Sequence, residues 1–385
     1  MKKLISILTC AVFLCCTLIP AVFAAATARE TGLRFNSDGR FKIVQFSDIQ
    51  DGTYLRAATK SFLKKTVESE KPDLVVLTGD NIAGYWAKSP AKSTHAIKQF
   101  MNIFESLGVP VAIVFGNHDD QDSGFSKEEQ MEVYNSFSVS VSLDEGDALS
   151  GCGTYNVPIL SSDGSKVAFN VWMFDSGTYD EGDGYDYGYD HVHADQVEWY
   201  KNKSDELKEA NGGEPVYSIA FQHIIVGEIW DALKEVGEGT EGAVEHDGKY
   251  YVLPDDAQGV LHETPCPGGR NDGQFASFLE QGDVLATVSG HDHVNTFVIP
   301  YRGVDIINTP TCGFRSYGEV ETRGARVFVI DEADTSVYET YLVSADEVLG
   351  GSADTAVLYK LQLFFKRVSD FFKDLRNRIE AFFGA

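Results

Sequence analysis

At residues 41–50 the chain reads FKIVQFSDIQ, an apolar run that ends in polar residues. The apolar part is typical of a buried strand, and Asp48 and Gln50 follow directly behind it. Residues 56–70 then have the pattern of an amphipathic helix, and residues 74–77 form a second apolar run. The alternation of strand and helix predicts a parallel sheet with right-handed crossovers.

Polar segments follow the apolar runs of this first part of the chain. They are Asp48-Ile49-Gln50, Gly79-Asp80-Asn81 and Gly116-Asn117-His118-Asp119. The third segment follows a predicted strand at 109–115, which comes after a second predicted helix at 91–107. Ligands of such sheets collect beyond the carboxyl ends of the strands, so we expect the three segments to converge on one crevice.

The later part of the chain is richer in predicted strands. We expect strands at 166–175, 215–221, 284–289, 294–300, 303–308, 325–331 and 336–343, and a helix at 193–210. Two further polar segments, Gln222-His223 and Gly290-His291-Asp292-His293, follow two of these strands. The pattern predicts an α/β fold in which a second sheet packs on the first and helices lie outside.

The five polar segments together supply oxygen and imidazole ligands for two metal ions. Asp80 is the expected bridging carboxylate, since one carboxylate can hold two cations roughly 3.5–4 Å apart. We expect Asp48 and His293 to complete the shell of one cation, with Gln50 as an additional, weaker ligand. For the other cation the expected ligands are Asn117, His223 and His291. This mixed set suits manganese, iron or zinc.

Each segment alone has a simpler interpretation. A Gly-Asp after a strand is usually a turn, and a lone buried histidine usually forms a hydrogen bond within the core. Gly116-Asn117-His118-Asp119 and Gly290-His291-Asp292-His293 are rarer, and both follow apolar strands. The order and the combination of the five segments therefore favour the metal site.

The set resembles the calcineurin-like metallophosphoesterase superfamily, whose pattern is Asp-x-His, Gly-Asp, Gly-Asn-His-Asp/Glu, a separate His, and Gly-His-x-His. The resemblance runs from about Phe41 to Ile330. Within it, residues 271–275, 282–284, 290–295 and 323–327 resemble the branch of small purple-acid-phosphatase-like proteins of fungi and plants. The resemblance implies a four-layer α/β/β/α sandwich and hydrolysis of phosphate mono- or diesters.

The chain departs from this family pattern at two places. Gln50 stands where the family usually has a metal-binding histidine, and a neutral amide oxygen is a weaker ligand than imidazole. The purple enzymes have an iron-binding tyrosine shortly after the Gly-Asp, whereas here Asn81-Ile82-Ala83-Gly84 follows and Tyr85 comes five positions after Asp80. We therefore expect no purple colour, and an inactive surface-binding protein that keeps the fold is the alternative to an enzyme.

The expected mechanism is attack of a metal-activated water on the phosphorus atom. His118 is the predicted general acid for the leaving oxygen, or else makes a structural hydrogen bond. Asp119 either orients that imidazole or caps the segment that follows. Arg270 and Asn271 are candidate substrate contacts, since the planar guanidinium of arginine suits phosphate. The expected partner is a small phosphorylated substrate.

The start of the chain has the features of a secretory signal at residues 1–26. Two lysines precede an apolar run up to Phe23, and small residues follow at 24–26. A retained anchor or lipoprotein signal is the alternative. Export would place the mature chain outside the cell or at its surface. Loss of the leader changes the formal net charge from −26 to −28, which disfavours nucleic acid as a standing partner.

The rest of the chain divides around the domain expected at 29–345. We expect a linker at 346–354 and an amphipathic C-terminal helix at 355–385, which carries six basic and three acidic residues. That helix could dock on its own domain, associate with another helix, or lie on a membrane or wall surface. The stretch 175–195 is rich in Gly, Tyr and Asp, and is expected to be a solvated loop, a lid or a calcium loop. Cys152, Cys266 and Cys312 allow one disulfide.

Overall fold

Two sheets form the centre of the computed structural model, which describes residues 32–145, 148–180, 188–350 and 368. The strands of the first sheet are, in order, β14 (Asp334–Ser344), β13 (Gly324–Asp331), β1 (Arg40–Phe46), β2 (Leu74–Thr78) and β3 (Val111–Val114). Strands β1, β2 and β3 are parallel, whereas β13 and β14 pair antiparallel at the other edge. The parallel sheet predicted for the first part of the chain is confirmed.

The second sheet has six strands. In order they are β11 (Val298–Tyr301), β12 (Val304–Asn308), β10 (Val284–Ser289), β6 (Ser218–Phe221), β5 (Val167–Met173) and β4 (Tyr155–Leu160). Strands β5, β6, β10 and β12 are parallel, and β4 and β11 are antiparallel edge strands. All but β4 were predicted from the sequence. The carboxyl ends of the parallel strands therefore offer a second set of ligand positions.

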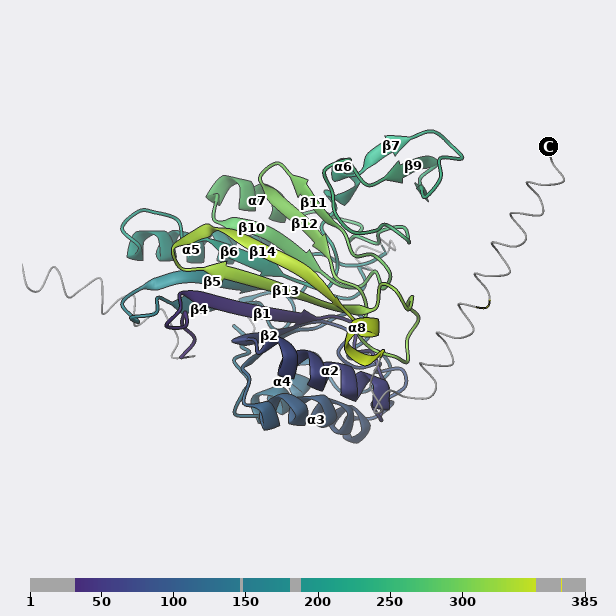
Figure 1. Cartoon of the computed structure of the whole chain (residues 1–385), viewed down its shortest axis with the longest axis horizontal. Coiled ribbons are helices and arrows are strands. Elements are labelled where there is room, and N and C mark those ends of the chain that lie inside the picture. Colours follow the sequence, from purple (N-terminus) through teal and green to yellow (C-terminus); the bar gives the residue numbers. More distant parts are fainter. Residues whose placement is uncertain (1–31, 146–147, 181–187, 351–367, 369–385) are drawn as a thin grey trace, which may run out of the picture.

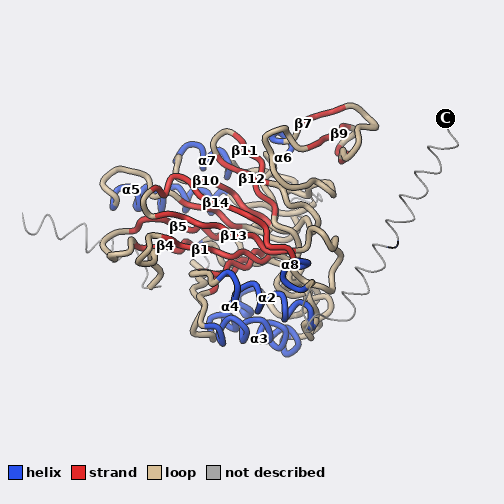
Figure 2. Tube along the Cα trace, viewed as in Figure 1, coloured by secondary structure: helices blue, strands red, loops and turns tan. Residues whose placement is uncertain are grey.

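Helices cover the outer faces of both sheets (Figures 1 and 2). The first sheet carries α2 (Ala57–Glu70), α3 (Pro90–Leu107) and α4 (Lys127–Asn135), and the second carries α5 (Ala194–Ala210) and α7 (Gln274–Gln281). Two short helices are α6 (Ile229–Ala232) and α8 (Ala345–Leu349). The four-layer α/β/β/α sandwich is confirmed.

Three apolar clusters hold the four layers together. Strand β1 contributes side chains to two of these clusters, because successive side chains of a strand point to opposite faces of the sheet. Phe41 and Ile43 belong to the cluster between the sheets, whereas Val44 and Phe46 belong to the cluster under the helices of the first sheet. The third cluster lies between the second sheet and its helices. Burial on both faces explains why the strand reads as a nearly continuous apolar run.

The helix ends follow local sequence rules. The α3 helix begins after Ser89, whose side chain accepts the N–H of Lys92, and ends at Gly108, which has φ 66°. The α4 helix was not predicted, although Ser126 and Glu129 form a reciprocal capping box at its start. Its polar composition hid the apolar periodicity, so the cap was the signal available in the sequence.

Other parts of the chain differ from the prediction. A small third sheet of β7 (Lys234–Val236), β9 (Lys249–Val252) and β8 (Val244–His246) lies within a stretch that the sequence left without structure. The predicted linker at 346–354 begins too early, because residues up to Leu349 form α8 and Leu349 is fully buried. The predicted signal at 1–26 and all but one residue of the predicted helix at 355–385 lie outside the described residues.

The cysteines and the helices give two further observations. Cys152, Cys266 and Cys312 are all free thiols, so the disulfide that the sequence allowed is not formed. Among the helices of the described residues, none combines the length and the apolar character needed to span a membrane.

Candidate metal centre

The seven predicted metal ligands lie behind the carboxyl ends of strands from both sheets. Asp48 and Gln50 follow β1, Asp80 follows β2, Asn117 follows β3, His223 follows β6, and His291 and His293 follow β10. All seven side chains are buried. The structure therefore brings together residues that lie up to 245 positions apart, because both sheets direct the ends of their parallel strands to one place.

One half of the centre surrounds the ring of His223. Its Nε2 lies 3.5 Å from Oδ1 of Asp80, 3.1 Å from Oδ1 of Asn117 and 3.3 Å from Nδ1 of His291. Ligand atoms of Asp48, Asp80 and His223 also lie within 4.8 Å of one another. These are the separations expected of atoms that face a common cation.

The other half of the centre contains Asp48, Gln50 and His293. Nε2 of His293 lies 3.3 Å from Oδ1 of Asp48, and Nε2 of Gln50 donates to Oδ2 of Asp80 at 3.1 Å. Oδ1 of Asp48 and Oε1 of Gln50 are buried and accept no hydrogen bond from any described residue. Buried oxygens are rarely left without a partner, so these two are suited to a cation.

The remaining ring nitrogens of two histidines are held by main-chain carbonyls. Nδ1 of His223 lies 2.9 Å from the carbonyl oxygen of Thr78, and Nδ1 of His293 lies 2.9 Å from that of Tyr317. The ring of Tyr317 also stacks on His293, with centroids 4.1 Å apart and planes 5° apart. A metal-binding histidine commonly donates its second N–H in this way, which orients the other nitrogen towards the metal.

The backbone is strained at four of the ligand positions. Asp48, Gln50, Asp80 and His291 have φ values of 53°, 38°, 47° and 69°. A left-handed conformation of a residue other than glycine costs on the order of 1–3 kcal/mol and is concentrated at functional sites. Gly79 explains a further close approach: a Cβ there would lie 2.7 Å from the amide nitrogen of Gly116.

Charges in the centre alter the pKa values of its histidines. Burial would lower the pKa of His223, but the neighbouring carboxylate of Asp80 raises it to about 9. Burial and the charge of His223 lower the pKa of His291 to about 3. Burial would raise the pKa of Asp80, but His223 holds it below the usual range. In this arrangement the carboxylates stabilise positive charge on the imidazoles, and a bound cation would supply that charge in place of a proton. The residues present therefore fit a pair of metal ions.

His118 lies at the edge of the centre. Its Nε2 is 4.0 Å from Oδ2 of Asp80, and its Nδ1 is 2.5 Å from Oε1 of Gln121. Its main-chain N–H donates to Oδ1 of Asp80 at 2.8 Å, and about a quarter of its side chain is exposed. Gln121 thus contacts the ring, as does Tyr85 with ring centroids 5.0 Å apart, and the sequence analysis did not single out Gln121.

Asp119 makes its contacts with the backbone. Its carboxylate accepts the N–H of Gly116 at 2.7 Å and the N–H of Ile82 at 3.0 Å, and it is fully buried. Burial, and next the charge of Asp80, raise its pKa to about 8. These two contacts are neither with the imidazole of His118 nor with the segment that follows; through them the carboxylate joins the turns after β2 and β3.

Arg270 and Asn271 line an open cavity of about 660 Å³. Nη2 of Arg270 lies 2.8 Å from Oδ1 of Asp180, and Nδ2 of Asn271 donates to Oε1 of Glu228 at 2.8 Å. Tyr189 also lines this cavity, and its ring packs against the ring of His291 with centroids 4.3 Å apart. The cavity that holds the two candidate substrate contacts therefore adjoins the metal centre.

Tyrosines contact several ligands, and the sequence analysis did not identify them. Besides Tyr317 and Tyr189, the hydroxyl of Tyr179 accepts a hydrogen bond from Nδ2 of Asn117 at 3.2 Å. Tyr179 and Tyr189 belong to the stretch 175–195, and both contact ligands of the centre, although Tyr179 is 42% exposed. The abundance of tyrosine in that stretch was the signal in the sequence.

Known proteins resemble this chain in sequence. The family model for calcineurin-like phosphoesterases matches residues 41–295, and the chain belongs to this family. It is 33% identical to "Probable inactive purple acid phosphatase 14" of Arabidopsis thaliana, over 75% of this chain and 74% of that relative. "Probable inactive purple acid phosphatase 29" of the same plant is 29% identical, over 83% and 82%.

Two further proteins are also similar to this chain. "Phosphatase DCR2" of Saccharomyces cerevisiae is 27% identical over 72% of this chain and 48% of that relative. Among solved structures, "GAP50 the anchor in the inner membrane complex of Plasmodium" is 12% identical, with a TM-score of 0.47 over 80% of this chain and 85% of that one. The family supports hydrolysis of phosphoesters in general and small phosphorylated substrates.

Proposed function

We propose that the chain is an exported phosphoesterase that holds two metal ions and hydrolyses phosphate mono- or diesters. The observation that carries the proposal is the convergence of seven buried ligand side chains from both sheets. Among them, facing ligand atoms of His223 and its three neighbours lie 3.1 to 3.5 Å apart. In the same place, the buried Oε1 of Gln50 accepts no hydrogen bond from the described residues, and Oδ1 of Asp48 lies 3.3 Å from Nε2 of His293.

The ligands divide into two sets that share Asp80. Asp48, Gln50 and His293 would hold one cation, and Asn117, His223 and His291 the other. When bound, such cations supply an activated water and offset charge on the phosphoryl oxygens. Carboxylate, amide and imidazole ligands suit manganese, iron or zinc, and the two sets differ because only the first contains the weak ligand Gln50.

His118 is the proposed general acid. Gln121 contacts Nδ1 of its ring, which leaves Nε2 directed towards the side of Asp80. From there it can give a proton to the leaving oxygen. Replacement of His118 by alanine should therefore slow hydrolysis of alkyl phosphates more than hydrolysis of p-nitrophenyl phosphate, whose leaving group needs no proton.

The cavity beside Tyr189 is the proposed place for the alcohol part of the substrate. Trp230 and His246 also line it, and their rings stack with centroids 3.8 Å apart. Arg270 lines the same cavity, where its guanidinium pairs with the carboxylate of Asp180. A small ester with a flat or apolar leaving group suits these walls.

The test is turnover by the purified protein. We expect hydrolysis of p-nitrophenyl phosphate or bis(p-nitrophenyl) phosphate after addition of manganese, iron or zinc. Asp80→Asn should abolish it, because both cations lose a ligand. Asp255→Asn, at a side chain 91% exposed and outside the centre, is the matched control and should keep full activity. Full activity of Asp80→Asn would overturn the assignment.

A second candidate function is a surface-binding protein with weak or no turnover. Two observations favour it: Gln50 is a neutral ligand, and the names of the two Arabidopsis relatives contain the word "inactive". Elemental analysis separates the candidates when it is combined with the assay. Bound metal without turnover for any of the three metals would favour the second candidate, and activity regained in Gln50→His would identify the cause.

Export and surface attachment are part of the same proposal. Sequencing of the N-terminus of secreted protein should show that it begins close to residue 27. Truncation after Gly351 tests the C-terminal segment. Unchanged activity with lost retention at the cell surface would support attachment to a membrane or wall, whereas lost thermal stability would support docking on the domain.

A further inference from the structure

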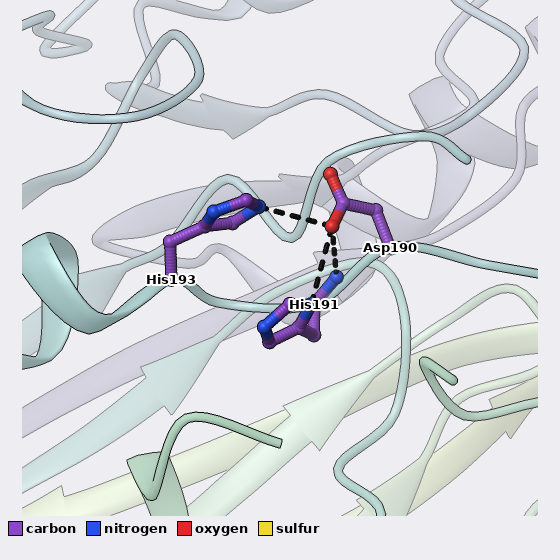
Figure 3. Close-up of side chains that lie close together, drawn as sticks. All are labelled: Asp190, His191 and His193. Atoms are coloured by element: carbon purple, nitrogen blue, oxygen red, sulfur yellow. Dashed lines mark hydrogen bonds and ion pairs between the residues drawn. The ribbon is translucent and has the colours of Figure 1, made fainter. Parts of the chain in front are cut away.

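A second group of potential metal ligands lies outside the centre described above. Asp190, His191 and His193 lie on the segment between Tyr189 and the start of α5. Figure 3 shows both rings directed at one oxygen of Asp190. Nε2 of His193 lies 3.0 Å from Oδ1 of Asp190, and Nδ1 of His191 lies 3.2 Å from the same atom.

These separations match the geometry of a bound cation. Zinc binds imidazole nitrogen and carboxylate oxygen at about 2.0–2.2 Å in tetrahedral sites, which places neighbouring ligand atoms about 3.3 Å apart. The ligand atoms of all three residues lie within 4.8 Å of one another. Two imidazoles and one carboxylate are also a set that zinc uses when one coordination position stays open.

His191 provides an independent observation. Only 9% of the residue is exposed, and neither ring nitrogen forms an aligned hydrogen bond with any residue in the described part of the chain. Yet both nitrogens lie close to carboxylates, since Nε2 is 3.3 Å from Oδ2 of Asp272. The imidazole of His191 is therefore buried between two carboxylates, and its Nδ1 faces the oxygen of Asp190 that His193 also faces.

Asp272 completes the arrangement from a different part of the chain. Its Oδ2 also accepts the main-chain N–H of Ala194 at 3.0 Å, which fixes the carboxylate beside His191. A carboxylate on the second nitrogen of a ligating histidine orients the ring and increases its basicity. Asp190 is anchored as well, because its Oδ1 accepts the main-chain N–H of His191 at 2.9 Å.

We propose that Asp190, His191 and His193 form a second, single-metal zinc site, in which Asp272 is a positioning residue for His191. The site fixes the segment that carries Tyr189, whose ring packs on His291 of the main centre.

The test is zinc binding by the full chain after removal of bound metal with a chelator. Isothermal titration with zinc alone should show one more equivalent in the wild-type protein than in His193→Ala. The variant Asp80→Asn/His223→Asn, which has lost ligands of the main centre, should still bind one equivalent, and addition of His193→Ala should remove it. His95→Ala changes an exposed histidine on α3 and is the matched control, with wild-type binding expected.

Two further measurements keep the proposal falsifiable. Asp272→Asn should keep the stoichiometry but weaken zinc binding at this site about 10- to 100-fold, as expected when a carboxylate partner of a ligating histidine is lost. If His193→Ala does not fold, as judged by circular dichroism, His193→Gln is used in its place. Equal zinc equivalents in the His193 variant and in His95→Ala would overturn the proposal, as would an Asp80→Asn/His223→Asn variant that binds no zinc. Both results concern metal binding alone, so they are independent of whether the main centre hydrolyses phosphoesters.

Discussion

Replacement of Lys127 by methionine should destabilise the fold by about 3 kcal/mol. Nζ of Lys127 lies 2.9 Å and 3.2 Å from the two carboxylate oxygens of Asp175, and both side chains are almost completely buried. Removal of one partner from a buried ion pair typically costs about 3–5 kcal/mol, because the other charge remains without compensation. The lower end applies here, since Asp175 keeps hydrogen bonds from the main-chain N–H groups of Cys152 and Gly177.

The assay is thermal unfolding at several pH values. With about 2.1 cal/mol/K per residue, a loss of about 3 kcal/mol in a domain of roughly 320 residues lowers the Tm by about 4–5 °C. Lys201→Met is the matched control: it removes a lysine whose pair with Glu280 is exposed, and should cost less than about 1 kcal/mol. Equal shifts in the two variants would refute the reasoning.

The pH dependence gives this prediction a second test. Burial would lower the pKa of Lys127, but the carboxylate of Asp175 raises it above the ordinary lysine value. A lysine with a raised folded-state pKa contributes stability that is fully present below its unfolded pKa of about 10.4 and is lost as the pH rises through the folded value. The penalty of Lys127→Met should therefore be the same at pH 6 and pH 9, and a penalty that vanishes at pH 9 would contradict it.

Three further predictions follow from other contacts. The pKa of His223 is raised to about 9, so zinc must displace a proton from this ring when it binds. The affinity of the main centre for zinc should therefore rise about tenfold per pH unit from pH 7 to 9 and then level off. A flat pH profile in competition titrations with a chelator would contradict this. Asp119→Ala should lower the free energy of unfolding, measured in urea, by about 1–3 kcal/mol, because two buried N–H groups lose their acceptor. A decrease below about 0.5 kcal/mol would contradict this prediction. Burial raises the pKa of the Cys266 thiol to about 12. Its alkylation by iodoacetamide, followed by peptide mapping, should therefore accelerate about tenfold per pH unit up to pH 10. An alkylation rate that levels off near pH 8 would contradict this prediction.

Much of the sandwich was predictable because its strands are apolar on both faces. The run at 41–46 is buried from both sides, and the polar residues that follow it mark the end of the strand. From that rule alone, Asp48, Asp80 and Asn117 could be placed at one edge of a sheet. The positions of His223 and His291 followed in the same way from the second sheet.

The rest depended on contacts that no local pattern records. Tyr189 packs on His291, and Tyr317 packs on His293, only because loops far apart in the chain fold back over the centre. The sequence suggested that Asp119 orients His118 or caps the segment that follows, whereas its contacts with Gly116 and Ile82 depend on how two turns approach each other. The strands at 234–252 are short and mostly polar or half-exposed, so neither periodicity nor length distinguished them from a loop.

The left-handed backbone at Asp48, Gln50, Asp80 and His291 has a consequence for protein engineering. Glycine adopts this conformation without strain, so a glycine at any of these positions would relax the main chain while it removes a ligand. At Gln50, whose Oε1 accepts no hydrogen bond from the described residues, lost contacts offset least of this relief, so a selection for heat resistance alone would favour a variant whose centre is damaged. Stabilised forms of this protein should therefore be screened for bound metal as well as for melting temperature.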